Sequence, residues 1–329
     1  MSTTCKSPRR ALQVAYVAAK DALPAYSHRF SPKTFTQYQL LACLVLKEFL
    51  KTDYRGVVSL LADCPELRAV IDLKTVPHFT TLQKAADRLL RKQPANRLLD
   101  ATVLLGRRAD LPRRRNLLAA IDSSGFEAHH TSHYFVRRRA NGDKQWQTTT
   151  YRRFPKLGLV VDCDNHLILS AVPGRGPGPD FFHLVQAVKD ARARRRIGTL
   201  LADAGYDAEW VHEFLREQLA IRSVIPPTIG RPTSKLPSSR WRRLMKQRFD
   251  QATYGQRWQC ETVFSMIKRR LGSTLGARSY WRQTRTLMRK AITHNVLILL
   301  RKFEVFYRAV LTPLPSICVG FAPNLLPVR

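Results

Sequence analysis

Acidic residues are scarce in this 329-residue chain: 24 aspartates and glutamates stand against 56 lysines and arginines, a formal net charge of +32. A charge that large repels itself in a compact fold, so an anionic partner is expected. Nucleic acid is the first such partner, because lysine and arginine neutralise its phosphates and release counterions. A membrane surface is the second.

The chain also lacks the features that define several other classes of protein. Its longest wholly apolar run near the C-terminus, residues 296–300, is far shorter than the ~20 residues that span a bilayer. The first ten residues are polar, with no apolar segment of the signal-peptide kind. The six cysteines form no C-x-x-C pair, so zinc spacing is absent and a cytosolic protein with reduced thiols is expected.

Hydropathy divides the chain into a helical region, an α/β region and a tail. Residues 1–112 contain long apolar stretches without strand-like alternation, which predicts a mostly helical N-terminal region. Residues 113–310 predict an α/β domain, with a basic insertion at about 229–250 and a proline-containing tail at 311–329. The strands of this domain are expected at 116–122, 157–162, 166–172, 198–203 and 220–225. Its helices are expected at 180–195, 207–218, 254–271 and 284–310.

Two of the predicted strands end in an aspartate. Asp122 lies in the sequence I-D-S-S-G-F, and Asp203 lies in A-D-A-G-Y-D. A buried carboxylate is costly unless a cation neutralises it, and Mg²⁺ prefers carboxylate oxygens. The two strand ends therefore favour a divalent-metal site, whereas each aspartate taken alone is explained as an ordinary turn residue.

One predicted helix carries a third carboxylate, Glu261. At about 100° per residue, Tyr254, Arg257 and Lys268 lie within about 40° of Glu261 around the helix axis. This polar stripe borders the apolar face around Phe264, whereas a solvated helix places its charges opposite its apolar face. We therefore expect Glu261 to meet the strand-end aspartates; the alternative is a surface glutamate.

Basic clusters supply further predicted DNA contacts. They are the run Arg137, Arg138 and Arg139, and the cluster Arg240, Trp241, Arg242 and Arg243. Against a net charge of +32, binding to a nucleic-acid backbone is favoured over an ordinary solvated surface. Trp241 either stacks on an unpaired base or packs inside the protein, and the sequence leaves both open.

Two other groups suggest ligands but have simpler explanations. Asp207 precedes a predicted helix, so we expect a helix N-cap rather than a metal ligand. His129, His130 and His133 have no cysteine or carboxylate set to complete a tetrahedral site. We expect these histidines near DNA or at the surface.

The spacing Tyr254-x2-Arg257-x3-Glu261-x6-Lys268 resembles the Y-R-E-K signature of DDE transposases from bacterial insertion sequences of the insertion-sequence four and five families. The resemblance covers about residues 117–300. It extends loosely to two segments of the helical region, residues 54–61 and 76–82.

The contexts of Asp122 and Asp203 are also similar to the first and second aspartate motifs of this family. The two aspartates are 81 residues apart, and Glu261 follows after a further 58. The short second interval resembles that of members with a modest insertion rather than a large β-rich one.

The resemblance implies a ribonuclease-H-like, retroviral-integrase-like catalytic domain. In such a domain, Asp122, Asp203 and Glu261 would hold two divalent ions, either Mg²⁺ or Mn²⁺, for an in-line displacement at a DNA phosphodiester. The other signature residues would contact the DNA backbone near the cut: Tyr254, Arg257 and Lys268.

The expected function is therefore that of a transposase. It would bind the terminal inverted repeats of its own element, cleave them and transfer the strands to target DNA, as a homodimer on double-stranded DNA associated with a bacterial nucleoid. Residues 1–112 would recognise the DNA ends or assemble subunits. The alternatives are a decayed or domesticated transposase that binds without cutting, another nuclease or resolvase on the same fold, and a basic nucleic-acid-coating protein.

Overall fold

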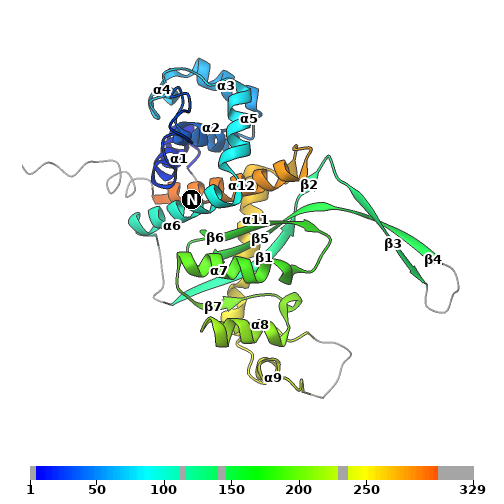
Figure 1. Ribbon diagram of the computed structural model, residues 1–329. Coiled ribbons are helices and arrows are strands. Elements are labelled where there is room, and N and C mark those ends of the chain that lie inside the picture. Colours follow the sequence, from blue (N-terminus) through cyan, green and yellow to red (C-terminus); the bar gives the residue numbers. More distant parts are fainter. Residues whose placement is uncertain (1–4, 112–115, 140–145, 229–235, 303–329) are drawn as a thin grey trace, which may run out of the picture.

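The computed structural model describes residues 5–111, 116–139, 146–228 and 236–302 (Figure 1). The predicted tail at 311–329, the end of the helix predicted at 284–310 and part of the basic insertion lie outside the described residues. Within the described ranges, no helix combines the length and the apolar character needed to cross a membrane.

Residues 5–111 form the helical region that their apolar stretches predict. The helices are α1 (Pro8–Ala22), α2 (Gln37–Phe49), α3 (Tyr54–Asp63), α4 (Pro65–Ala69), α5 (Phe79–Leu89) and α6 (Lys92–Arg108). Local signals begin them: Ser7 caps α1 ahead of Pro8, and Thr36 and Gln39 form a capping box at α2. The boundary predicted at residue 112 falls between α6 and the first strand.

A five-stranded mixed sheet follows, in the order β6-β5-β1-β7-β8. Its strands are β1 (Leu117–Gly125), β5 (Phe154–Asp162), β6 (Ile168–Gly176), β7 (Ile197–Leu201) and β8 (Arg222–Val224). β7 runs parallel to β1 and β8, whereas β5 runs antiparallel to β1 and β6. Each strand overlaps an apolar run that predicts it. The helices between them are η1 (Asp180–His183), α7 (Leu184–Arg194) and α8 (Glu209–Glu213), which continues as a π-helical turn, η3 (Phe214–Gln218).

Side chains of the sheet alternate between two cores. On one face, Leu118 and Ala120 of β1 join the core formed by the N-terminal helices, α11 (Trp258–Leu271) and α12 (Tyr280–Leu299). On the other face, Ala119 and Ile121 join a smaller core under α7 and α8. Figure 1 shows α7 in front of the sheet and α11 behind it. The N-terminal helices and one face of the sheet therefore share a continuous core.

Two pairs of strands are not predicted from the sequence. β3 (His133–Arg139) and β4 (Trp146–Arg152) form an antiparallel ribbon that projects from the body of the molecule (Figure 1). β2 (Glu127–Ala128) pairs in parallel with β9 (Thr274–Leu275). The ribbon is rich in arginine, threonine and glutamine, so it has no apolar alternation by which a strand is recognised.

The helix predicted at 254–271 is interrupted near its start. α10 (Gln251–Tyr254) leads into a 3₁₀ turn, η4 (Gly255–Arg257), and α11 then ends before Gly272 as predicted. Gly272 has φ of 87°, a conformation that glycine adopts without strain. The last long helix, α12, begins earlier than predicted because Ser279 caps it, and a 3₁₀ turn, η5 (Leu300–Lys302), follows it.

Candidate active site

Strand pairing sets Asp122 beside Asp203. β1 and β7 are parallel, and Ala120 pairs with Leu201 at the carboxyl end of their ladder. Two residues further along each segment come Asp122, still within β1, and Asp203, just past the end of β7. Paired residues of β1 and β7, such as Ala120 and Leu201, are 81 residues apart in the sequence, and so are the two aspartates. Both carboxylates therefore emerge at the same level of the sheet.

Both aspartates belong to the sheet face that α11 covers. Ala120 of β1 and Leu201 of β7 point into the core that contains α11. Because side chains along a strand alternate with a period of two, Asp122 and Asp203 are expected on this face as well. In agreement, Asp122 Oδ2 lies 3.8 Å from Nη1 of Arg257, the residue just before α11.

Arg257 connects two of the three predicted carboxylates. Its guanidinium donates a hydrogen bond to Glu261 Oε1 through Nη2, while Nη1 faces Asp122. The Asp122 side chain is 17% exposed and that of Glu261 is 54% exposed, so the group opens to solvent on the side of the helix. The positive charge offsets the repulsion between the two carboxylates.

Further along α11, Lys268 contacts β1 directly. Its ammonium donates a hydrogen bond to Ser124 Oγ at 2.8 Å and lies 5.3 Å from the ring centroid of Phe126. Ser124 follows Asp122 by two residues and so shares its face of the strand. The polar side of α11 therefore lies along the second half of β1, in the orientation that the helical period predicts.

Tyr254 and Asp203 lie at the other end of this group. Burial raises the pKa of Tyr254, and the negative charges of Asp203 and Glu261 raise it further, against the opposing charge of the nearby arginine. Asp203 Oδ1 also accepts a hydrogen bond from the backbone N–H of Gly205 at 2.9 Å, which caps the turn η2 (Ala204–Tyr206). Asp203 thus caps the turn that follows β7 and also lies beside Asp122.

The donor set suits a divalent ion, although its members do not converge on one point. Asp122, Asp203 and Glu261 offer only oxygen ligands, which Mg²⁺ and Mn²⁺ prefer. In the part of the chain that the structure describes, no three His, Cys, Asp or Glu side chains are close enough together to hold a metal ion. Because Glu261 is bonded to Arg257, it would have to turn toward the aspartates to complete such a site.

The α/β region matches the family model described as "Transposase DDE domain" over residues 114–296. The chain belongs to this family. The matched segment begins just before β1 and ends within α12, so it contains the whole candidate site. Membership makes the protein a transposase, and DNA is the partner that the family implies. No curated protein matches the chain.

The transposase carries its other predicted DNA contacts on two outlying elements. Arg137 is exposed on β3, and the side chains of Arg138 and Arg139 lie outside what the structure describes. Arg240 and Arg243 are exposed on α9 (Arg240–Gln247), the helical piece of the basic insertion. Arg240 instead faces Glu217, and Arg243 donates to the backbone oxygen of Pro237. Within the described residues, no contact joins these arginines to Asp122, Asp203 or Glu261.

Trp241 packs within the protein, one of the two possibilities that the sequence leaves open. Its indole N–H donates a hydrogen bond to Glu217 Oε1 at 2.8 Å. The guanidinium groups of Arg216 and Arg240 lie 4.7 and 4.4 Å from its ring centroid. These contacts use both the polar atom and the ring of Trp241 to hold α9 against the turn that follows α8.

The prediction that Asp207 caps a helix is wrong, because Ala208 occupies the N-cap of α8. The Asp207 side chain is instead buried and bonded to the Arg242 guanidinium at 2.9 Å and to the backbone N–H of Thr228 at 2.6 Å. Burial alone would raise the pKa of Asp207, but these hydrogen bonds lower it below its usual value. Arg242 is therefore engaged in anchoring the basic insertion.

Ser124 is the residue of this group that the sequence reasoning missed. The signal that could have found it is the strand period, since two residues separate it from Asp122. His129 and His130 line a cavity at the base of the ribbon, and His133 begins β3. Within the described residues, none of these histidines belongs to a metal-ligand cluster.

Proposed function

We propose that this transposase binds the terminal inverted repeats of its own mobile element, cleaves DNA strands there with the help of divalent ions, and joins them to target DNA. The observation that carries the proposal is the placement of the three carboxylates. Asp122 lies within β1 and Asp203 lies just past the end of the adjacent parallel strand β7, at the same level of the sheet. Glu261 lies on the helix that covers their shared face.

The finer family assignment belongs to the same proposal. In the sheet order β6-β5-β1-β7-β8, only β5 runs opposite to the other strands, which supports a ribonuclease-H-like, retroviral-integrase-like domain. The spacing of Tyr254, Arg257, Glu261 and Lys268 supports membership of the insertion-sequence four and five families.

Asp122, Asp203 and Glu261 would hold two Mg²⁺ or Mn²⁺ ions. When bound, such ions supply Lewis acidity that activates a water or a 3′-hydroxyl and stabilises the leaving oxygen. The protein would contribute hard oxygen ligands from β1, from the segment just after β7 and from one helix. The Glu261 side chain is more exposed than that of Asp122, which leaves it room to reorient.

The remaining signature residues suit a phosphate backbone. Arg257 offers a planar fork of donors that matches two phosphate oxygens, and Lys268 offers a point charge. The Tyr254 hydroxyl is protonated at neutral pH, as that of an ordinary tyrosine is, so it can donate a hydrogen bond. Together they would hold the DNA strand beside the carboxylates.

The assembly is part of the proposal as well. We assign DNA-end recognition or subunit assembly to residues 1–112, catalysis to residues 113–310, and a homodimer to the DNA-bound state, because two ends must be handled together. A single-chain mass by gel filtration, both free and bound to DNA, would contradict the dimer.

The decisive experiment is a cleavage assay on labelled DNA that carries the element ends, with Mg²⁺. Glu261→Gln removes one ligand charge, so it should abolish cleavage and leave DNA binding intact. The matched control is Glu213→Gln, an exposed glutamate on α8, which should cleave as the wild type does. Cleavage by Glu261→Gln would overturn the site. Binding without cutting by every variant, the wild type included, would favour the decayed or domesticated transposase.

A further inference from the structure

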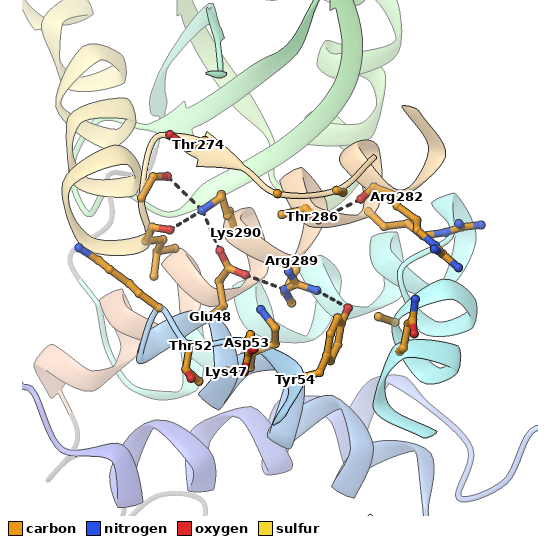
Figure 2. Close-up of a pocket in the computed structure, with 18 of the residues that line it drawn as sticks. Lys47, Glu48, Thr52, Asp53, Tyr54, Thr274, Arg282, Thr286, Arg289 and Lys290 are labelled. Atoms are coloured by element: carbon orange, nitrogen blue, oxygen red, sulfur yellow. Dashed lines mark hydrogen bonds and ion pairs between the residues drawn. The ribbon is translucent and has the colours of Figure 1, made fainter. Parts of the chain in front are cut away.

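A second basic site lies away from the carboxylates, in a cavity of about 780 Å³ between the N-terminal helices and α12 (Figure 2). We call it the inter-region cavity. α2, α3 and α5 line one side of it, and the end of α11, the β9 segment and α12 line the other. Its lining contains seven lysine or arginine side chains and three carboxylates. Positive charge is therefore in excess.

The acidic side chains of this cavity are already engaged. Glu48 is bonded to Arg289 at 2.7 Å and to Lys290 at 2.8 Å, and Figure 2 shows it between the two. Asp87 is shared by Arg282 and Arg285, at 3.2 and 3.3 Å. The third, Asp53, accepts the Gly56 N–H at the start of α3. Two cations thus compete for each of the first two carboxylates.

Two further cations, Lys47 and Arg278, make no ion pair or hydrogen bond within the described residues. The Lys47 ammonium lies 4.9 Å from the ring centroid of Tyr54, on the wall of the cavity. Burial, and then the nearby Arg289, lower the pKa of Lys47 to about 8, although Glu48 and Asp53 act in the opposite direction, so its positive charge is only partly compensated. Arg278 is exposed at the opposite rim. A bound anion would supply the missing negative charge.

We propose that the inter-region cavity binds backbone phosphates of the transposase's DNA beyond the cleavage point, with Lys47 and Arg278 as its ligands. This inference rests on the proposed function. α11 connects the two places, since Glu261 lies at the candidate active site and Leu271 lines the cavity. At 1.5 Å per residue, the separation along the helix is about 15 Å. That distance is the axial length of about four base pairs.

The neighbourhood of Arg278 extends the same surface. Arg278 also lines an adjoining cavity of about 410 Å³ at the base of the ribbon, together with Arg153 and Arg175. No carboxylate is among the described residues that line this second cavity. Two adjoining basic cavities fit a linear polyanion better than a single small anion.

The lining of the inter-region cavity also disfavours a free nucleotide. Tyr54 is the only aromatic residue among the described lining, and Lys47 already lies against its ring. A nucleobase would thus have no free aromatic surface on which to stack. The lining side chains therefore suit binding to phosphate groups rather than to nucleobases.

The test measures binding of a labelled duplex carrying one element end, without divalent metal, over a range of salt concentrations. Variants Lys47→Gln, Arg278→Gln and their combination are compared with Lys189→Gln and Arg192→Gln, exposed residues of α7 across the sheet. The slope of log affinity against log salt should fall by roughly 0.9 for each lost contact, and by roughly 1.8 for the double variant. For each lost contact, the ratio of wild-type to variant affinity should therefore be roughly eightfold larger in 0.1 M salt than in 1 M salt.

Each outcome separates this inference from the proposed function. Equal slopes for the cavity variants and the α7 variants, with cleavage intact, would overturn the inference alone. Failure of the wild type to bind the end DNA would overturn the proposed function. Weaker binding of adenosine monophosphate by the double variant, with unchanged DNA binding, would identify a small-anion site and overturn the inference. Arg278→Gln changes an exposed side chain, so it keeps the test valid if Lys47→Gln unfolds the protein.

Discussion

Arg257 is the residue on which the geometry of the candidate active site depends most. It stands between Asp122 and Glu261, and it lies 6.0 Å from the ring centroid of Tyr254. The guanidinium lies between two carboxylates, so its positive charge offsets their mutual repulsion.

Replacing Arg257 with lysine keeps the charge but removes the fork of donors. We expect Arg257→Lys to lower the single-turnover rate of strand cleavage by about 10- to 100-fold, the effect of losing one charge-assisted hydrogen bond. Arg269→Lys, at an exposed position of α11, the helix that follows Arg257, is the matched control. An unchanged rate for Arg257→Lys would argue that the guanidinium only neutralises charge.

At the scale of helices and strands, a buried ion pair joins the N-terminal region to the α/β region. Glu48 of α2 pairs with Arg289 and Lys290 of α12, and all three side chains are almost fully buried. Lys290 also donates to the backbone oxygens of Leu271 and Gly272 at the end of α11. Glu48 and Lys290 together thus link α2, α11 and α12.

Removing the charge of Glu48 should destabilise the whole protein. Glu48→Gln leaves two buried cations without their partner, so we expect a loss of roughly 3–5 kcal/mol in the free energy of unfolding. Glu213→Gln is the exposed control and should cost little. Urea unfolding at pH 7 measures both, and equal stability of the two variants would show that Arg289 and Lys290 find other partners.

The same carboxylate predicts an acid transition. Burial alone would raise the pKa of Glu48, but Arg289 and Lys290 lower it to about 2, from an ordinary value of 4.5. A lowered folded-state pKa stabilises the protein above the unfolded value, and this contribution is lost as the pH falls from about 4.5 toward 2. Unfolding measured between pH 5 and pH 2.5 should show a steeper loss for the wild type than for Glu48→Gln. Parallel curves would contradict this assignment.

Elements that follow from local sequence were predictable, and those that depend on distant partners were not. The apolar runs before Asp122 and Asp203 predict strands, because a strand that is buried on both faces is recognised by a continuous run of apolar residues. The β3–β4 ribbon has no such run and depends on pairing between its two polar halves. Glu48 and Arg289 are separated by 241 residues, so no local pattern joins them. Asp207 was misassigned for the same reason: its partner Arg242 is 35 residues away.

At the scale of the whole molecule, the continuous core argues against treating the helical region as a detachable part. Residues such as Leu44 of α2, Leu98 of α6 and Ile292 of α12 belong to one buried cluster with Leu118 of β1. Removing the N-terminal helices would expose the apolar side of α12. Lysines and arginines outnumber acidic residues in the remaining part as well, so the self-repulsion of their charges would add to this loss.

We expect a fragment of residues 113–329 to lack cooperative folding, although it contains the whole of the matched family segment. Circular dichroism during heating should show a broad, gradual change where the full chain shows one sharp transition. A sharp transition in the fragment would instead establish the region after residue 112 as a domain that folds on its own.

The way β1 and β7 pair has a consequence for how relatives of this chain can diverge. The β3–β4 ribbon leaves the sheet after β1 and returns at β5, so its length does not enter the register that sets Asp122 beside Asp203. Lineages could lengthen or shorten the ribbon over evolutionary time without moving either aspartate. The step from Arg257 to Glu261 has no such freedom, because it is one turn of a helix. In an alignment of related sequences, insertions and deletions should therefore concentrate in the ribbon and be absent from the turn between Arg257 and Glu261.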